Sequence, residues 1–243
     1  MKYRFEIEKR DFSDLASGRV LYNAPNTTAF PVRLASELAQ RAFEVLQNQG
    51  EHGPYCVCDP CCGGGYLLTT IGFLFADQIA ELIGTDVDES ALRTARQNLS
   101  LLTPEGLEKR KAELEGYLQE YGKQSHKEAL ASLERLRSLL GARRIKTNCQ
   151  KRDITDLSPY PVSDVDVIIT DLPYGNIAHW AGGGQDPVAN LFINCRRAMR
   201  PNRSVLVIVA DKQTKLKHGL FQRIEWFKLG KRQIALFQPT AGA

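Results

Sequence analysis

The stretch Cys58-Asp59-Pro60-Cys61-Cys62-Gly63-Gly64-Gly65 joins a short apolar segment at residues 55–59 to a longer one at residues 66–76. The first has the length and composition of a buried strand, and the second has those of an apolar helix. The glycines allow a tight turn and leave backbone N–H groups at the helix start open to a ligand. A strand, a glycine turn and a helix in this order predict a cofactor site in an α/β sheet.

The alternation of strand and helix continues along the chain. A second strand ends before Asp88, which is expected to cap the next helix. Alternation of this kind predicts a doubly wound, Rossmann-like α/β sheet, which a C-terminal hairpin would extend to seven strands, in one domain over residues 1–243. Besides 55–59, strands are expected at residues 81–86, 144–150, 165–170 and 204–210, a helix at 188–199, and the hairpin strands at 223–229 and 233–238.

Charge is unevenly distributed over the 243 residues, whose formal net charge is +4. From residue 191 to the end there are eleven Lys and Arg against two acidic residues, so the rest of the chain is mildly acidic. A basic segment of this kind suits a protein that presents one face to a polyanion such as RNA. An ordinary solvated surface is the alternative. Within the segment, we assign Lys228, Lys231 and Arg232 to the RNA face.

Two segments flank or interrupt the alternating pattern. Residues 1–50 contain a lead-in helix whose apolar stripe follows Phe30. Residues 103–142 are predicted to form an inserted helical hairpin, in which Thr103 caps the first helix and a capping box of Ser125 and Glu128 begins the second. The insertion carries seven basic and seven acidic residues. Two roles stay open for this neutral hairpin: a structural brace, or a grip on RNA or on a second copy of the chain.

No export signal or membrane span is expected. The chain begins with mixed charged and apolar residues, and its longest apolar run, at residues 66–76, is too short to cross a bilayer. Four cysteines, at positions 56, 58, 61 and 62, suggest a metal site at first sight. Two of them alternate along a strand and two lie in the turn after it, so four thiolates would not converge. We therefore expect a cytoplasmic protein with reduced cysteines and no metal.

Asp59 points to the kind of cofactor that the glycine turn binds. The glycines do not follow the G-x-G-x-x-G spacing of dinucleotide-binding turns. A carboxylate in the turn would repel a pyrophosphate, but it would attract the ammonium group of the cation S-adenosylmethionine. We assign Asp59, Cys61, Gly63 and Gly65 to the binding of this methyl donor.

Further donor contacts are expected at the ends of the next two strands. Asp86 lies about 20 residues beyond the glycine turn, where an acidic residue that binds ribose hydroxyls belongs. Val87 can lie against the adenine ring. Asp153, which follows the third expected strand, is assigned to the adenine amino group, with a plain surface aspartate as the alternative.

The fourth expected strand ends in Asp171-Leu172-Pro173-Tyr174-Gly175. This resembles the [D/N]-P-P-[Y/F] motif of amino-directed methyltransferases, with Leu172 in place of the first proline. A base drawn out of an RNA must be oriented by its Watson–Crick edge and by its face. We assign Asp171 to the edge, Tyr174 to the face and Pro173 to the turn between them. Residues 176–185 could form a lid, in which His179 is either catalytic or a surface residue.

Several segments together resemble the AviRa type of ribosomal RNA methyltransferase: 13–18, 29–35, 59–63 and 170–175. The resemblance covers most of the chain, and Gly64 replaces an expected serine. It implies a class I methyltransferase fold, S-adenosylmethionine as donor and a guanine of large-subunit ribosomal RNA as acceptor. Within segment 29–35, we assign Phe30 to the donor site and Arg33 to the RNA face. Antibiotic resistance is not implied, because a housekeeping enzyme could carry the same motifs.

The atom that receives the methyl group is left open by the motif. Asp171 can accept hydrogen bonds from both N1–H and the N2 amino group of guanine. Amino-directed motifs favour N2, whereas the AviRa resemblance points to N1, which we favour with Asp171 as acceptor and base. The alternatives are N-methylation of a protein glutamine or a small molecule, and a non-catalytic RNA-binding protein; a nicotinamide-dependent oxidoreductase would need a different glycine spacing.

Overall fold

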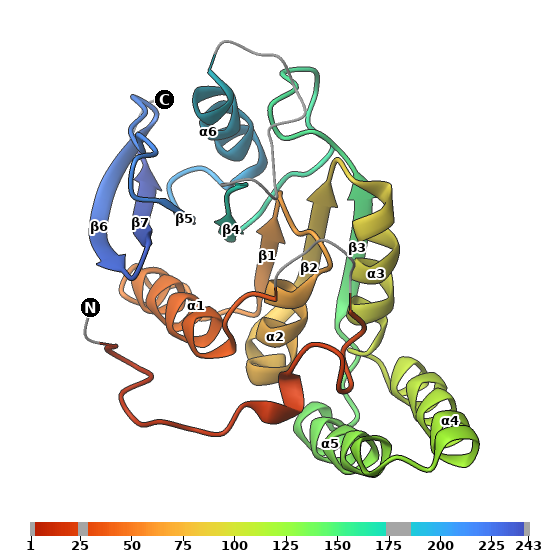
Figure 1. Cartoon of the computed structure of the whole chain (residues 1–243). Helices are drawn as coiled ribbons and strands as arrows, with labels where there is room; N and C mark the ends of the chain where they lie inside the picture. Colours follow the sequence, from red (N-terminus) through yellow and green to blue (C-terminus); the bar gives the residue numbers. More distant parts are fainter. Residues whose placement is uncertain (1–2, 24–28, 174–185, 241–243) are drawn as a thin grey trace.

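The computed structural model describes residues 3–23, 29–173 and 186–240 and contains a seven-stranded sheet (Figure 1). Five strands are parallel, and the last two form an antiparallel hairpin at one edge. The strand order is β3-β2-β1-β4-β5-β7-β6. The strands are β1 (Tyr55–Asp59), β2 (Ile79–Asp86), β3 (Lys146–Lys151), β4 (Val167–Asp171), β5 (Val205–Asp211), β6 (Phe221–Leu229) and β7 (Arg232–Pro239).

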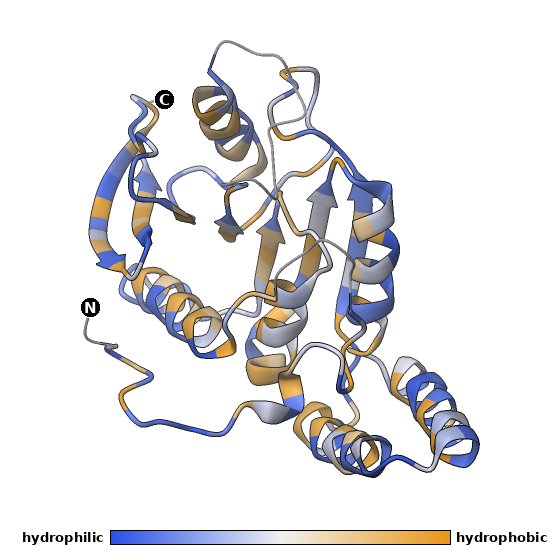
Figure 2. Cartoon of the chain, in the orientation of Figure 1, coloured by the Kyte–Doolittle hydropathy of each residue, from blue (hydrophilic) through white to orange (hydrophobic). Residues whose placement is uncertain are grey.

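Helices cover both faces of the sheet, as the doubly wound prediction requires (Figure 1). One face packs into a core that includes Leu38 and Leu92, and the other packs against Phe192 and Cys195. The helices are α1 (Val32–Gln47), α2 (Tyr66–Leu74), α3 (Glu89–Ser100), α4 (Pro104–Tyr121), α5 (Gln124–Leu140) and α6 (Pro187–Ala198), with short 3-10 turns at Ser13–Leu15 and Ala76–Gln78. Figure 2 shows apolar residues along α1 and α2, the helices beside the central strands.

The expected order of strands and helices is confirmed, with small shifts at the ends. The helix expected to reach residue 76 ends at Leu74, and a 3-10 turn follows it. The strand expected from residue 165 begins at Val167, since Val165 forms only an isolated bridge with Met199. Asp88 caps α3 as predicted, because its side chain accepts from the Ser90 N–H at 2.8 Å.

The insertion forms the expected helical hairpin, but one of its two predicted caps is wrong. Thr103 Oγ1 accepts from the Gly106 N–H at 3.1 Å, so the first cap is confirmed. The second helix begins earlier than predicted, with Lys123 at the N-cap position and no side-chain cap. Ser125 therefore lies inside the first turn of α5, where it cannot act as the cap of a capping box.

The hairpin of α4 and α5 lies at the end of the sheet opposite to the arrowheads of β1 and β2 (Figure 1). Arg110 is buried and its Nε donates to the Val20 carbonyl at 2.8 Å. Arg135 pairs with Asp14 at 2.6 Å. These contacts hold the N-terminal segment against the hairpin, which supports the brace interpretation; a grip on RNA stays a prediction.

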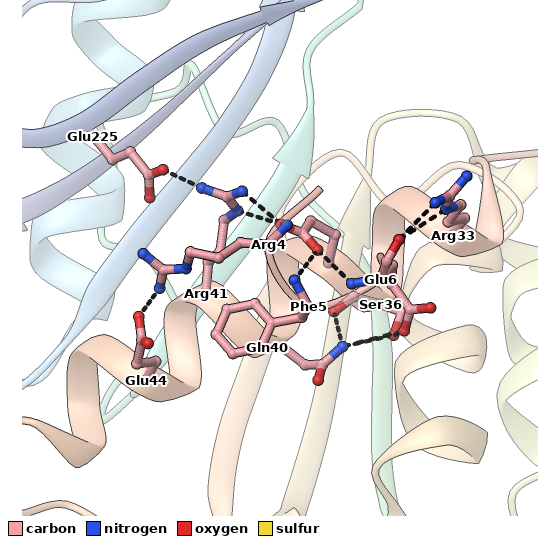
Figure 3. Close-up of polar contacts among 10 residues, drawn as sticks. Arg4, Phe5, Glu6, Arg33, Ser36, Gln40, Arg41, Glu44 and Glu225 are labelled. Atoms are coloured by element: carbon pink, nitrogen blue, oxygen red, sulfur yellow. Dashed lines mark hydrogen bonds and ion pairs between the residues drawn. The ribbon is translucent and has the colours of Figure 1, made fainter. Parts of the chain in front are cut away.

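A buried polar network fastens residues 3–10 to α1 (Figure 3). The Glu37 carboxylate accepts from the backbone N–H groups of Arg4, Phe5 and Glu6 at 2.8–2.9 Å. Burial raises the pKa of Glu37, but these donors and Arg41 outweigh burial and lower it. Arg41 also pairs with Glu225 on β6. The N-terminal segment, α1 and the outer strand β6 are therefore connected through buried charges that hydrogen bonds satisfy.

Within the described part of the chain, no helix is long and apolar enough to cross a membrane.

Candidate functional site

The candidate site lies at the carboxyl ends of β1 and β4, two neighbouring strands between which the chain reverses its direction of winding. Ligands of open α/β sheets bind at such a switch point. A pocket of about 110 Å³ opens there. Its walls come from the segment before α1, the turn between β1 and α2, and the end of β4, and they consist of Phe30, Asp59, Cys61, Cys62, Gly63, Gly64, Tyr66, Leu67 and Asp171.

Strand geometry places Asp59 and Asp171 on the same face of the sheet. Each is the last residue of its strand, two positions beyond Val57 and Ile169 respectively. Val57 and Ile169 belong to the core that α1 and α2 cover. Because side chains alternate across a strand, both carboxylates project toward that side, where Phe30 and the start of α2 complete the pocket.

The glycine turn has the close backbone approach expected of it. Gly63 and Gly65 have φ angles of +50° and +75°, which favour glycine. A Cβ atom on Gly65 would lie 3.0 Å from the Cα of Ala95, so a larger residue would also push α3 away. The same helix also holds Gly64, since Asn98 Nδ2 donates to the Gly64 carbonyl at 2.8 Å. At Gly65, therefore, no side chain fits between the turn and α3.

Asp59 is a buried carboxylate in the pocket wall. It is 3% exposed, and its Oδ1 accepts from the Cys61 N–H at 3.0 Å. Burial raises the pKa of Asp59 to about 7, with the negative charges of Asp86 and Asp171 adding to the effect. A cationic ligand would relieve both effects. The site therefore fits the cationic methyl donor that the sequence predicted.

Asp86 is the last residue of β2, and its side chain holds the glycine turn through hydrogen bonds. Its Oδ2 accepts from the Gly63 N–H at 2.8 Å, and its Oδ1 accepts from the Asp88 N–H at 3.0 Å. Each carboxylate oxygen has a further lone pair, so the side chain, which is half-buried, can still accept from a ribose hydroxyl. Val87 beside it is half-buried. The structure thus places Asp86 next to the turn, and the role of Val87 toward adenine stays a prediction.

Asp153 follows β3, the strand beside β2, as the sequence indicated. Its Oδ1 accepts from the N–H of Thr155 at 2.8 Å and from the hydroxyl of Thr155 at 2.7 Å. These bonds close a local turn, and Asp153 is not among the residues that line the pocket. Its role toward adenine stays a prediction.

Asp171 has a partner that the sequence did not assign to it. The Nη2 of Arg232 lies 3.7 Å from Asp171 Oδ2, and the guanidinium of Arg232 lies 5.7 Å from the ring centre of Phe30. Arg232, which was assigned to the RNA face from the sequence, therefore lies at the rim of the pocket. The pairing of β7 with β5 determines this position, and no local motif reports that pairing.

The motif that begins with Asp171 is only partly described. Leu172 is 2% exposed, and its N–H donates to the Val209 carbonyl at 2.9 Å. A proline here, as in the amino-directed motif, would lack this N–H, which gives a physical reason for leucine. Pro173 is half-buried. Tyr174, His179 and the expected lid at residues 176–185 lie outside the described residues.

The cations assigned to the RNA face have different surroundings. Lys228 Nζ lies 5.1 Å from the ring centre of Trp226, which is 44% exposed and belongs to none of the motifs in the sequence. Lys231 is exposed in the turn between β6 and β7. Arg33 is engaged in the fold, because its Nη2 donates to the Glu6 carbonyl at 2.6 Å and its guanidinium lies 4.1 Å from the ring centre of Tyr3.

The six cysteines are free thiols. Burial raises the pKa of Cys58 and Cys61 well above the ordinary thiol value. Among residues 3–23, 29–173 and 186–240, no group of three or more His, Cys, Asp or Glu is arranged to hold a metal ion.

Two pocket residues were not assigned to the site from the sequence. Tyr66 and Leu67 were predicted only as the first turn of a helix. Nothing in their spacing distinguishes them from core residues.

Comparisons with known proteins show similarity to ribosomal RNA methyltransferases. The family described as rRNA methyltransferase AviRa matches residues 1–232. The 23S rRNA (guanine(2535)-N(1))-methyltransferase of Streptomyces viridochromogenes is 39% identical over 98% of this chain and 96% of its own. The solved structure of the rRNA methyltransferase AviRa from that organism has a TM-score of 0.85 at 38% identity, covering 97% of this chain and 96% of its own.

A more distant structure shows the wider fold class. A protein of Listeria monocytogenes that is assigned to the class I S-adenosylmethionine-dependent methyltransferases has a TM-score of 0.55 at 16% identity. The match covers 90% of this chain and 62% of that protein. The seven-stranded sheet described above is therefore the class I methyltransferase sheet, as the sequence predicted.

Proposed function

This chain belongs to the AviRa family of ribosomal RNA methyltransferases, and on that premise we propose that it methylates N1 of a guanine in 23S ribosomal RNA with S-adenosylmethionine as donor. The observation that carries the proposal is that two carboxylates, Asp59 and Asp171, line the same pocket at the ends of neighbouring strands. Asp59 is buried and suited to a cation, while Asp171 stands beside it at the end of the adjacent strand. One carboxylate serves the donor and the other serves the acceptor.

The donor half of the site uses the glycine turn and the ends of β1 and β2. When bound, S-adenosylmethionine supplies an electrophilic methyl group on a sulfonium. Asp59 would accept from its ammonium group, and Asp86 from its ribose hydroxyls. The remaining residues proposed to contact the donor are Phe30, Cys61, Gly63, Gly65, Val87 and Asp153. The raised pKa of Asp59 fits this assignment, because burial of the free carboxylate is unfavourable until a cation binds.

The acceptor half is built around Asp171. Its carboxylate would accept the N1–H of a guanine that has been drawn out of the RNA, and would take up the proton when N1 is methylated. Pro173 shapes the turn, and Tyr174 is proposed to stack on the base. N1 rather than N2 is favoured because the Streptomyces relative is named for N1.

The RNA is proposed to approach over the β6–β7 hairpin. Lys228 and Lys231 would contact phosphates, with Arg33 as a further candidate. Exposed Trp226 beside Lys228 offers an aromatic surface on which an unpaired base could stack. Because the proposed substrate is ribosomal RNA, we also propose that the enzyme acts in the cytoplasm.

Methyl transfer from labelled donor tests this function. The purified chain is incubated with 23S RNA, with assembled large subunits and with a protein extract from a strain that lacks the gene. We expect label in 23S RNA and none in protein. Label in protein glutamine, or in no macromolecule while donor binding is intact, would replace the proposal with the protein or small-molecule alternative.

A further inference from the structure

The last strand of the sheet brings a cation to the acceptor carboxylate. β7 runs antiparallel to β5, so its first residue, Arg232, lies at the same edge as the carboxyl ends of the parallel strands, opposite Asp211. Arg232 is two positions before Ile234, which belongs to the core that also holds Ile169. Alternation therefore directs the side chains of Arg232 and Asp171 to the same face of the sheet.

The backbone beside Arg232 is firmly held. The neighbouring residue, Gln233, is buried, and its Nε2 donates to the carbonyls of Asp211 at 2.8 Å and Thr214 at 2.6 Å. Its Oε1 accepts from the indole N–H of Trp226 at 2.9 Å. These bonds fix the start of β7, which positions the guanidinium at the pocket rim with little freedom of the main chain.

The pair of Arg232 and Asp171 is close but remains accessible. Nη2 and Oδ2 are 3.7 Å apart, and the two side chains are 24% and 25% exposed. A guanidinium carries five N–H donors in a planar fork, so it can contact a carboxylate and a base at the same time. The pair thus presents a hydrogen-bond donor next to a hydrogen-bond acceptor at the edge of the pocket.

We propose that Arg232 donates to O6 of the target guanine and stabilises the negative charge that O6 gains when N1 loses its proton. This inference rests on the proposed function. Guanine presents O6, an acceptor, next to N1–H, a donor, and this order complements Arg232 next to Asp171. Adenine presents an amino donor and an acceptor in the same places, so both contacts would be repulsive. The pair therefore selects guanine and not adenine.

The charges balance through the step. The N1 proton moves to the Asp171 carboxylate, and the electron pair of the broken N–H bond stays on the ring, shared between N1 and O6. N1 forms its bond to the methyl carbon while the bond from that carbon to sulfur breaks, and the sulfur keeps the pair. The base ends as neutral N1-methylguanine, and Asp171 returns its proton to water. A fixed cation at O6 acts where charge develops, as in an oxyanion hole.

Three variants test the role of Arg232: Arg232→Gln, Arg232→Lys and, as a control for the loss of one charge, Lys146→Gln. Lys146 is exposed at the start of β3, at the end of the sheet away from the pocket. Turnover at saturating RNA, KM for RNA and donor affinity by calorimetry are measured from pH 6.5 to 9.5. We expect Arg232→Gln to bind the donor normally and to lose about 10²–10³-fold in kcat, the usual effect of removing one oxyanion donor. Arg232→Lys should retain more turnover than Arg232→Gln. The loss of kcat in Arg232→Gln relative to wild type should become smaller as pH rises. At high pH, hydroxide in solution removes the N1 proton of the guanine, so the reaction depends less on Arg232.

The outcomes separate this inference from the proposed function. A raised KM with unchanged kcat in Arg232→Gln would make Arg232 a phosphate contact and overturn the inference. If Arg232→Gln loses the same factor in kcat at every pH, then Arg232 only positions Asp171. That result would also overturn charge stabilisation at O6. Failure of the proposed function is read in the wild-type enzyme instead, as absence of N1-methylguanine in the RNA.

Discussion

Asp59 and Asp171 could be assigned from the sequence because each ends an apolar strand, and the carboxyl ends of parallel strands meet at one edge. Arg232 could not be assigned in the same way. Its place at the rim depends on the pairing of β7 with β5, between residues far from Asp171 in the chain. Leu172 was read as a departure from a motif, whereas in the structure its N–H holds β4 to β5.

Replacement of Asp59 by asparagine should raise stability and weaken donor binding. Burial raises the pKa of Asp59 from 3.8 to about 7. The folded state thus holds the proton more tightly than the unfolded state, and this stabilisation is full below about pH 4 and lost as pH rises through 7. In the absence of donor, the stability of Asp59→Asn should therefore match that of wild type near pH 4 and exceed it at pH 8 by on the order of 4 kcal/mol.

Urea unfolding at both pH values, with calorimetry of donor binding, checks this. Wild-type affinity for the donor should fall below pH 7, where Asp59 becomes protonated. In Asp59→Asn the affinity should be lower by about 1.5–3 kcal/mol, the contribution of a charged hydrogen bond. Equal free energies of unfolding for the two proteins at pH 8 would show that burial of the Asp59 carboxylate does not destabilise the fold.

The Leu172 position tests why the proline of the related motif is absent. Leu172→Pro removes the N–H that donates to Val209 and leaves that carbonyl unsatisfied. We expect a loss of about 1–3 kcal/mol in the free energy of unfolding. Leu172→Met is the matched control, since it keeps the N–H and should lose less than about 1.5 kcal/mol. Urea midpoints that coincide for the two variants would mean that the bond contributes nothing.

Strands and helices were largely predictable, because apolar periodicity and caps such as Asp88 and Thr103 are local signals. The start of α5 was predicted wrongly because a capping box was inferred from Ser125 and Glu128, although the turn after α4 is short enough for the helix to begin at Gln124. The β6–β7 hairpin was expected, but the positions of its cations were not. The antiparallel register places Arg232 at the pocket rim, whereas Lys228 and Lys231 are exposed on the surface.

The hairpin cations that face outward should govern the salt dependence of RNA binding. We expect Lys228→Glu with Lys231→Glu to flatten the slope of log affinity against log salt by about 0.7 for each single-strand phosphate that is no longer neutralised. Arg232 stays unchanged, since it lies at the rim of the pocket beside Asp171. Filter binding at several salt concentrations measures the slope, and Lys109→Glu on α4 is the control. A slope that changes only in Lys109→Glu would move the RNA face to the insertion.

The doubly wound sheet with helices on both faces follows from the alternation of strand and helix in the sequence, whereas the strand order is known only from the structure. The fastening of the N-terminal segment does not follow from that alternation either. Glu37 binds backbone groups more than thirty positions away, and Arg41 reaches Glu225 across the fold. Both residues lie on an otherwise amphipathic helix, where charged residues are normally read as solvated. Long-range polar contacts of this kind have no periodicity in the sequence.

The atom that is methylated tests the central claim most directly. 23S RNA from a strain without the gene is treated with the enzyme and donor, the modified nucleotide is identified by mass spectrometry, and primer extension is run across it. A methyl group on N1 blocks Watson–Crick pairing, so reverse transcriptase should stop at a monomethylguanine. RNA treated with Asp171→Asn, which should still bind the donor, should show little modification. Read-through at a site that carries monomethylguanine would contradict N1 methylation.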